Sequence, residues 1–454
     1  MKTIINRFDL YRFERLVSKL VKPSELPAVV MFTSSADSLQ LAAFCSGAVL
    51  TYTLPICSET KPFTLPWTAL KELAAKKDVV EFDVNGKDVT FFWSTNGIPQ
   101  RRVFESSDTG DKRLPPKPEK TVTHSFKLFD AMTEAAKCVD DNNVRYALGS
   151  ICLRGANNQI VSTDGRQALI QDDFDFPFDN DVLCLPSKIF ASKEFLELGE
   201  TVKTGVKDNW VYFNVGSVSF WLQKVEGKFP QLDQFTKNID DHTWLDLDPT
   251  DAIFVSEKLD NLPGKNNTDN PVYIGLDKSV VAVRGHDTTM QTATELRLEN
   301  SRFTGSNVTV CMNRKFLKNA LAFGITRLGF DPKDVAPIVG YGDKRTFVVM
   351  PLEGDEPKVE AEKLTMLSSK GNAVSPKITE KPLKPEKPVS NRKIKSKSKP
   401  KGKVAMLDEA VKLRLSLRTT LADVNGLIQS IKSQRRQDKL LRDTVASLRK
   451  LQPV

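Results

Sequence analysis

The sequence predicts an α+β fold in which one helix–sheet–helix–sheet unit occurs three times. Each unit begins with an amphipathic helical pattern, at Leu10–Val21, Phe126–Val139 and, more weakly, Asp251–Leu259. Short strands with alternating apolar residues follow, then a strand that runs into a second helix, then a hairpin. The pattern recurs about every 120 residues. We therefore expect three similar domains rather than one large core.

In each of the three units, the segment in which a strand runs into the second helix has a residue at the expected helix start that favours helix initiation. Pro66 and Pro186 stand at the expected helix starts of the first two units, where a missing N–H has no intrahelical partner to lose. Asn313 takes this place in the third unit and is expected to cap the helix with its side chain.

Hairpin patterns close each unit. The expected hairpins are Val79–Trp93, Trp210–Gln223 and Ala336–Leu352. Their turns are expected near Gly86, Gly216 and Gly342, because glycine tolerates the backbone of a tight turn. A further hairpin is expected within 142–169, where two apolar strands are separated by Gly155–Asn158.

Composition and cysteine usage exclude several classes of protein. No apolar run reaches the roughly 18 residues of a membrane span. The first residues lack a signal-peptide core, so we expect a cytoplasmic protein. The six cysteines form no CxxC pair and are expected to be reduced, and the three histidines lack metal-ligand spacing. No metal and no cofactor are predicted.

Motifs of enzyme chemistry are also missing from the sequence. It contains no GxSxG, GxxxxGK[ST] or HExxH motif. Paired carboxylates such as Asp140–Asp141 and Asp172–Asp173 stand in polar, turn-like contexts, where solvated turn residues are the better interpretation. We expect a protein without catalytic residues; a nucleic-acid-processing enzyme would need scattered carboxylates to meet in the fold.

Four motifs occur in the order found in one known family. Residues 142–169 contain VRYALGSICL and VSTDGRQAL, and they are followed by the segments Val182–Lys188 (VLCLPSK), Lys224–Pro230 (KVEGKFP) and Phe347–Leu352 (FVVMPL). Together these segments resemble the bacterial DNA polymerase III β subunit, the sliding clamp. The resemblance implies three clamp domains, at 1–119, 120–244 and 245–352. It further implies a head-to-tail homodimer ring that encircles duplex DNA as a processivity factor.

The resemblance also implies a pocket between the second and third domains. In the family this pocket binds short peptide motifs of the polymerase and of clamp-loader subunits, a hydrophobic-groove mode of recognition. The implied pocket residues are Leu148, Thr163, Gly165, Arg166, Gln167, Ala168, Val348 and Met350. The family's TDGHRLA is here TDGRQAL, so pocket shape and peptide preference are expected to differ.

Basic residues on the expected helices are candidates for contact with the phosphates of DNA. They are spread over all three units, as contacts that do not depend on base sequence require. The candidates are Arg12, Arg15, Lys19, Lys22, Lys71, Lys76, Lys127, Lys137, Lys188, Lys193, Lys258, Arg314, Lys315 and Lys318. A solvated helix face is the alternative interpretation for each of them.

The chain changes character after Leu352. Residues 353–454 hold 24 of the 66 Lys and Arg residues and only 12 of the 57 Asp and Glu residues. Residues 353–403 are rich in Lys, Pro and Ser and are predicted to be a disordered linker, whose run Lys393–Lys403 either contacts nucleic acid or only solubilises the chain.

Residues 404–454 regain helical periodicity. A series of residues from Leu407 to Ile431, apolar except for Arg414, recurs at steps of three and four, which indicates either a short coiled coil or an amphipathic helix that docks on the body. Because the family lacks such an extension, an alternative function remains. In it the chain is a clamp-derived scaffold that assembles through the coiled coil and does not encircle DNA.

Overall fold

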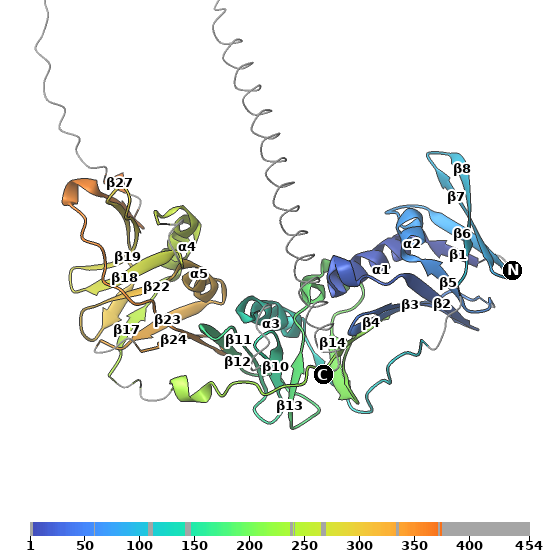
Figure 1. Cartoon of the computed structure of the whole chain (residues 1–454), viewed down its shortest axis with the longest axis horizontal. Helices are drawn as coiled ribbons and strands as arrows, with labels where there is room; N and C mark the ends of the chain where they lie inside the picture. The colour runs from blue at the N-terminus through green and yellow to red at the C-terminus, as the bar shows by residue number, and fades with distance from the viewer. Residues whose placement is uncertain are drawn as a thin grey trace, which may run out of the picture. The chain divides into compact units, whose positions relative to one another are not determined.

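A computed structural model describes residues 3–58, 60–107, 112–140, 147–236, 239, 241–264, 269–332, 336–370 and 373–374. The chain divides into two units after Ile378, and every described residue belongs to the first unit (Figure 1). The coiled coil expected at 404–454 and the run Lys393–Lys403 lie outside the described residues.

The described part of the first domain contains two α-helices, one 3₁₀ turn, η1 (Pro23–Glu25), and eight strands. The α-helices and strands are β1 (Thr3–Asn6), α1 (Arg7–Leu20), β2 (Val29–Ser35), β3 (Ser38–Cys45), β4 (Ala48–Leu54), β5 (Phe63–Pro66), α2 (Trp67–Leu73), β6 (Val79–Asn85), β7 (Asp88–Thr95) and β8 (Ile98–Glu105). The side chain of Asn6 caps α1 by accepting from the backbone N of Phe8 at 2.9 Å. Leu10, Phe13 and Val17 then recur on one face of α1 and are fully buried.

The second domain repeats this order with shorter helical segments. Its elements are β9 (Val122–His124), α3 (Lys127–Ala135), η2 (Ala136–Cys138), β10 (Ile151–Arg154), β11 (Gln159–Thr163), β12 (Gln167–Gln171), β13 (Asp181–Cys184), η4 (Lys188–Ala191), η5 (Lys193–Glu197), β14 (Val202–Lys207), β15 (Trp210–Val215), β16 (Val218–Gln223) and η6 (Asp233–Thr236). The prediction of a second α-helix in this domain is wrong. Two 3₁₀ turns replace it, because Ser192, which stands between them, has an extended backbone and interrupts the helix.

In the third domain both expected helices are α-helices, as in the first domain. Its elements are β17 (Thr243–Asp246), α4 (Pro249–Lys258), η7 (Leu259–Asn261), β18 (Pro271–Asp277), β19 (Val280–Asp287), β20 (Thr292–Arg297), β21 (Arg302–Thr304), β22 (Val308–Asn313), α5 (Arg314–Ala322), β23 (Ile325–Phe330), β24 (Ile338–Gly342) and β25 (Arg345–Val349). The expected cap is confirmed, since Asn313 Oδ1 accepts from Lys315 N at 2.8 Å. The expected boundary after residue 244 falls within β17, so this domain begins slightly earlier.

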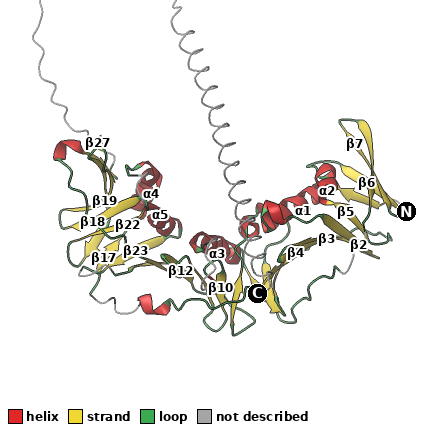
Figure 2. Ribbon diagram, viewed as in Figure 1, coloured by secondary structure: helices red, strands yellow, loops and turns green. Residues whose placement is uncertain are grey.

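Each domain contributes two antiparallel sheets with the same strand order. One sheet runs β5-β2-β3-β4 in the first domain, β13-β10-β11-β12 in the second and β22-β18-β19-β20 in the third. The other runs β1-β6-β7-β8, β9-β14-β15-β16 and β17-β23-β24-β25, and in the third domain β21 adds a fifth strand beside β17. Helices α1 and α2 pack together in the first domain, and α4 and α5 in the third (Figure 2). The predicted threefold α+β architecture is confirmed.

The domains are joined by strand pairing across their boundaries. Strand β4 of the first domain pairs antiparallel with β16, the last strand of the second domain, over five residue pairs. Strand β12 of the second domain pairs antiparallel with β25, the last strand of the third domain, again over five pairs. Each junction therefore obeys one rule, by which the fourth strand of a domain pairs with the last strand of the next.

Residues 353–370 and 373–374, which we name the strap, contain regular secondary structure, so the prediction of a disordered linker is wrong for this stretch. The strap contains η8 (Ala361–Lys363), β26 (Leu364–Ser368) and the short β27 (Ala373–Val374). Strand β26 pairs in parallel with β20 and extends the sheet of the third domain. The few apolar residues of this stretch could not predict a strand from composition alone, because the edge of β20 supplies the pairing that stabilises it.

Candidate functional site

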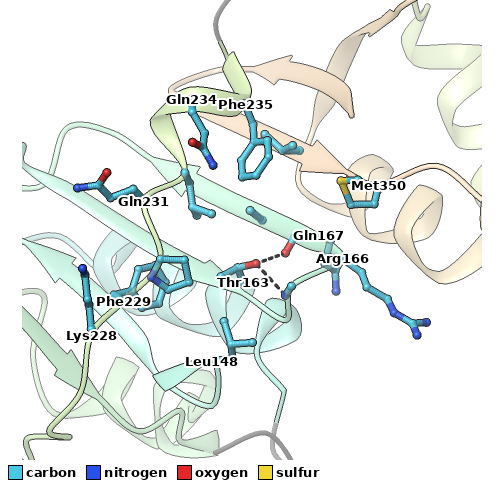
Figure 3. Close-up of a pocket in the computed structure, with 15 residues that line it drawn as sticks. Leu148, Thr163, Arg166, Gln167, Lys228, Phe229, Gln231, Gln234, Phe235 and Met350 are labelled. Carbon is cyan, nitrogen blue, oxygen red and sulfur yellow. Dashed lines mark hydrogen bonds between the residues drawn. The ribbon is translucent and has the colours of Figure 1, made fainter. Parts of the chain in front are cut away.

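All eight residues expected to form a peptide pocket line one cavity. It has a volume of about 560 Å³ and lies where β12 of the second domain pairs with β25 of the third. Ala168 and Val348 are register partners across this junction and form part of the floor. Leu148 and Thr163 line the cavity from the second domain, and Met350, whose exposed fraction is 40%, lines it from the third (Figure 3).

The turn between β11 and β12 shapes one wall of the cavity. Thr163 Oγ1 donates to the carbonyl oxygen of Gln167 at 2.7 Å and accepts from Gly165 N at 3.0 Å (Figure 3). Gly165 has a φ of +85°, which a side chain would strain. Asp164 Oδ1 accepts from the backbone N of Arg166 and of Gln167, both at 2.9 Å. The TDG sequence therefore holds this turn through its own side chains.

Gln167, one of the departures from the family motif, has a structural role in addition to its place on the wall. Its side chain is buried, and its Nε2 donates to Asp164 Oδ2 at 2.9 Å and to the carbonyl oxygen of Lys137 at 3.3 Å. Its Oε1 accepts from Asn319 Nδ2 on α5 at 3.0 Å. Gln167 therefore links the turn to both domains and offers little polar capacity to a ligand.

Arg166, a second departure from the family motif, has a side chain that points away from the cavity. Its side chain extends away from the other labelled residues in Figure 3 and its Nη1 lies 3.1 Å from Asp269 Oδ1. Its backbone still contributes to the junction, because the carbonyl oxygen of Arg166 accepts from Met350 N at 2.8 Å. The altered motif therefore changes the rim of the cavity more than its floor.

The segment 228–235 completes the cavity, although the sequence did not assign it there. It adds the residues Lys228, Phe229, Pro230, Gln231, Leu232, Gln234 and Phe235. Leu232 is buried, whereas Phe229 and Phe235 are half-buried and present ring surface to the cavity (Figure 3). The KFP motif was a signal for this wall, since it is one of the four segments that resemble the family.

The cavity suits a short peptide that inserts apolar side chains. Its floor is formed by Ala168, Leu232 and Val348, and two aromatic rings stand at its side. Met350 is flexible and polarizable, which lets one cavity pack against different side chains. Polar groups of Gln231 and Gln234 at the rim are exposed and can bond a peptide backbone. Such a site binds through shape and burial of apolar surface.

The described residues offer no metal centre. Among them, no group of three or more His, Cys, Asp or Glu side chains is placed to hold a metal ion. In the same part of the chain, no helix is long and apolar enough to cross a membrane.

The prediction of a DNA-facing position is wrong for one residue of the expected set. Arg314 is only 4% exposed, and its guanidinium donates to the carbonyl oxygens of Leu262 and Pro263 at 2.7 and 2.5 Å. It fastens the start of α5 to the segment after α4 and cannot reach a phosphate. Its neighbours Lys315 and Lys318 are exposed, although Lys318 pairs with Asp260.

Three basic residues of α1 contact the second domain. Arg12 is 12% exposed in its side chain, and its guanidinium bonds Glu197 at 2.6 Å and the hydroxyl of Tyr52 at 3.0 Å. Arg15 Nε and Lys19 Nζ approach the two carboxylate oxygens of Glu194 at 3.3 and 2.6 Å. These contacts stabilise the junction of the two domains, so the three charges are partly neutralised.

The remaining candidates divide by exposure. Lys258 is half-buried, with its Nζ 4.8 Å from the ring centre of Phe254. The candidates that the structure leaves exposed on helices, 3₁₀ turns or the loops beside them are Lys22, Lys71, Lys76, Lys127, Lys137, Lys188, Lys193 and Lys315. They belong to all three domains, as contacts with a duplex backbone would require.

Glu194 makes the junction of the first two domains sensitive to pH. Its burial raises the carboxyl pKa, but hydrogen bonds from Lys19 and Ser192 outweigh this and lower the pKa to about 2. A depressed pKa contributes stability that is present above the ordinary value of 4.5 and is lost as the pH falls towards 2. We expect Glu194→Gln to lower the melting temperature at pH 7 by about 2–4 °C and by much less at pH 2.

Differential scanning calorimetry from pH 7 to pH 2 measures this effect. Glu197→Gln is the matched control, because Glu197 pairs with Arg12 but is 62% exposed in its side chain. Exposed pairs contribute little, so its melting curve should follow that of the unaltered chain. An unchanged difference between Glu194→Gln and the unaltered chain at pH 7 and pH 2 would contradict the assignment.

Solved structures with the same fold are known, whereas the sequence matches no protein-family model and no curated protein. A DNA polymerase III β subunit from Pseudomonas aeruginosa is similar with a TM-score of 0.65 and 16% identity, over 78% of this chain and 100% of that one. A putative β subunit from Eubacterium rectale has a TM-score of 0.66 and 16% identity over the same shares. The β chain from Streptococcus pneumoniae has a TM-score of 0.66 and 13% identity, also over 78% and 100%. The chain therefore has the sliding-clamp fold.

Proposed function

We propose that this protein is a sliding clamp that encircles duplex DNA and tethers a polymerase and its accessory factors through the cavity between its second and third domains. The observation that carries the proposal is the cavity itself. Eight residues chosen by resemblance to the clamp family line one apolar hollow on a chain that has the clamp fold. This function requires no catalytic residue and places the protein with DNA in the cytoplasm.

The mechanism follows from topology rather than from tight binding. A closed ring slides because contacts with phosphates carry no sequence information, and the exposed lysines of three domains are suited to such contacts. A polymerase held in the cavity by a short peptide remains at high effective concentration near the primer end. Peptides of clamp-loader subunits would use the same cavity during loading.

Strand β8 supports a head-to-tail ring of two copies. The corresponding last strands of the other domains, β16 and β25, are covered by β4 and β12. Among the described residues, the outer edge of β8 has no partner, and Ile98 and Val103 on it are 63% and 48% exposed. An open edge of this kind invites pairing with another chain. By the rule of the internal junctions, its partner would be β20 of a second copy.

Retention on DNA tests the proposal. The protein is bound to nicked circular duplex, the salt concentration is raised, and release is followed before and after the circle is linearised. We expect slow release from the circle and rapid release from the linear form, because only a closed ring depends on the topology of the DNA. Equal release from both forms, with steep dependence on salt, would mean electrostatic binding and would contradict the proposal.

One observation favours a clamp-derived scaffold as the second candidate function. The edge of β20 is already covered by β26, so the described chain does not present both edges that a ring needs. A scaffold would keep the peptide cavity but would show the same release from circular and linear DNA. The retention experiment therefore decides between the two functions.

A further inference from the structure

The strap occupies the edge that the junction rule reserves for a second copy. In the first two domains, the fourth strands β4 and β12 pair with the last strands β16 and β25 of the next domain. By the same rule, the fourth strand of the third domain, β20, would pair with the last strand of a first domain, β8, which must come from a second copy. Strand β26 instead lies along β20, from Ala293 opposite Leu364 to Arg297 opposite Ser368. These are five residue pairs, as many as each internal junction has, so little of β20 remains free.

Polar contacts fasten the strap before and after β26. Glu356 accepts from His286 Nε2 at 2.9 Å and from Arg284 Nη1 at 3.2 Å. Arg284 also pairs with Glu295 of β20 at 2.6 Å, so the first anchor includes the covered strand. After β26, Ser369 N donates to the carbonyl oxygen of Arg297 at 3.1 Å and Ser369 Oγ accepts from Glu299 N at 3.1 Å.

The strap is held more weakly than the strands of the internal junctions. Its residues Leu364, Met366 and Leu367 are only half-buried, whereas β16 is buried along nearly its whole length. Its pairing with β20 is parallel, which is slightly less stable per residue than the antiparallel pairing of both internal junctions. The advantage of the strap is covalent connection, which gives it an effective concentration on the order of mM.

We propose that the strap is an intramolecular competitor of β8 from a second copy, so that the ring closes only when the strap leaves β20. The occupant that replaces it is β8 of the second copy, in antiparallel register, as at both internal junctions. This inference rests on the proposed function for the meaning of ring closure, but the competition itself concerns only self-association. Release of the strap, by a partner or by mass action at high protein concentration, would then control assembly.

A reversible staple tests the competition in the full chain. Thr294 and Thr365 are register partners on β20 and β26, so the double variant Thr294→Cys/Thr365→Cys can form a disulfide that fixes the strap. The exposed Cys57 is replaced by serine in this background. Sedimentation equilibrium then measures self-association of the oxidised and reduced forms. The single variant Thr294→Cys controls for oxidation at other sites.

We expect the oxidised double variant to self-associate at a dissociation constant at least tenfold higher than the reduced form. The single variant should show no such difference. Identical association curves for the oxidised and reduced double variant, including no association in either, would overturn the proposal. Any association through the C-terminal tail is present in both forms and does not alter their difference.

Truncation provides a second measurement. A chain that ends at Leu352 lacks the strap, and a chain that ends at Ile378 retains it while lacking the same tail. We expect the shorter chain to dimerise at a concentration at least tenfold lower; equal or weaker dimerisation would contradict the competition.

Retention on nicked circular DNA is measured separately on the reduced double variant. Dimerisation without retention would refute the clamp but not the competition, and retention with no effect of the staple would refute only the competition.

Discussion

Met350→Asp is expected to weaken peptide binding about 100-fold, which corresponds to about 2.7 kcal/mol. The side chain of Met350 lines the cavity and is 40% exposed, so the change should leave the fold intact. An aspartate there places a charge beside the apolar floor of Ala168 and Val348, and a bound peptide would remove water from that charge. Fluorescence anisotropy with a pool of labelled hexapeptides, each carrying one leucine and one phenylalanine, measures the loss.

Met290→Asp is the matched control for this prediction. Met290 is 71% exposed in the connection between β19 and β20, and it does not line the cavity. The same chemical change at that position should leave the dissociation constant of the pool within a factor of two of the unaltered chain. Equal weakening by both variants would indicate a general effect of charge, and no weakening by Met350→Asp would remove the cavity from the proposed function.

The floor of the cavity was predictable because it is built from continuous strands. Thr163 and Ala168 lie on β11 and β12, and Val348 lies on β25, so a motif in each strand carries its residues to one place. The wall at 228–235 is largely irregular, and its residues reach the cavity through a path that no periodicity describes. The place of Phe235 in the cavity could therefore be recognised from the folded structure but not from the sequence.

Charge on a helix was a weaker guide than apolar patterning. Arg314 and Lys315 are adjacent at the start of α5, yet the first is buried against backbone carbonyl groups and the second is exposed. Arginine presents five donors and can satisfy buried carbonyl oxygens while remaining charged, which a sequence does not distinguish from exposure. Which basic residues face solvent depends on which loops end beside the helix.

The strap shows the same limit for strands. Its neighbours in sequence are charged and rich in lysine and proline, a composition typical of disorder. Leu364, Met366 and Leu367 form a strand because β20 offers an unpaired edge, and that edge exists only once the third domain has folded. Local composition predicted the character of the segment, and tertiary context overrode it.

Asp251→Ala is expected to lower the free energy of unfolding by about 3 kcal/mol, because it leaves several buried donors without an acceptor. The carboxylate is fully buried, and its Oδ2 accepts from Ser301 N and Ser301 Oγ at 2.7 Å and from Asn300 N at 3.0 Å. Its Oδ1 accepts from Asn300 Nδ2 at 3.0 Å. These bonds fix the connection between β20 and β21 on the first turn of α4. Urea denaturation at pH 7 measures the loss.

Asp248→Ala separates this role from ordinary helix capping. Asp248 is the N-cap of the same helix and accepts from Thr250 N at 2.8 Å, so its loss should cost only about 1 kcal/mol. Burial raises the pKa of Asp251, but hydrogen bonds from Ser369, Ser301 and Asn300 outweigh it and lower the pKa below 3.8. The stability that Asp251 contributes is therefore complete at pH 7 and is lost as the pH falls through its folded pKa. Asp251→Ala and the unaltered chain should approach each other below pH 3.8, and a difference that persists there would show that packing, rather than the carboxylate, accounts for the effect.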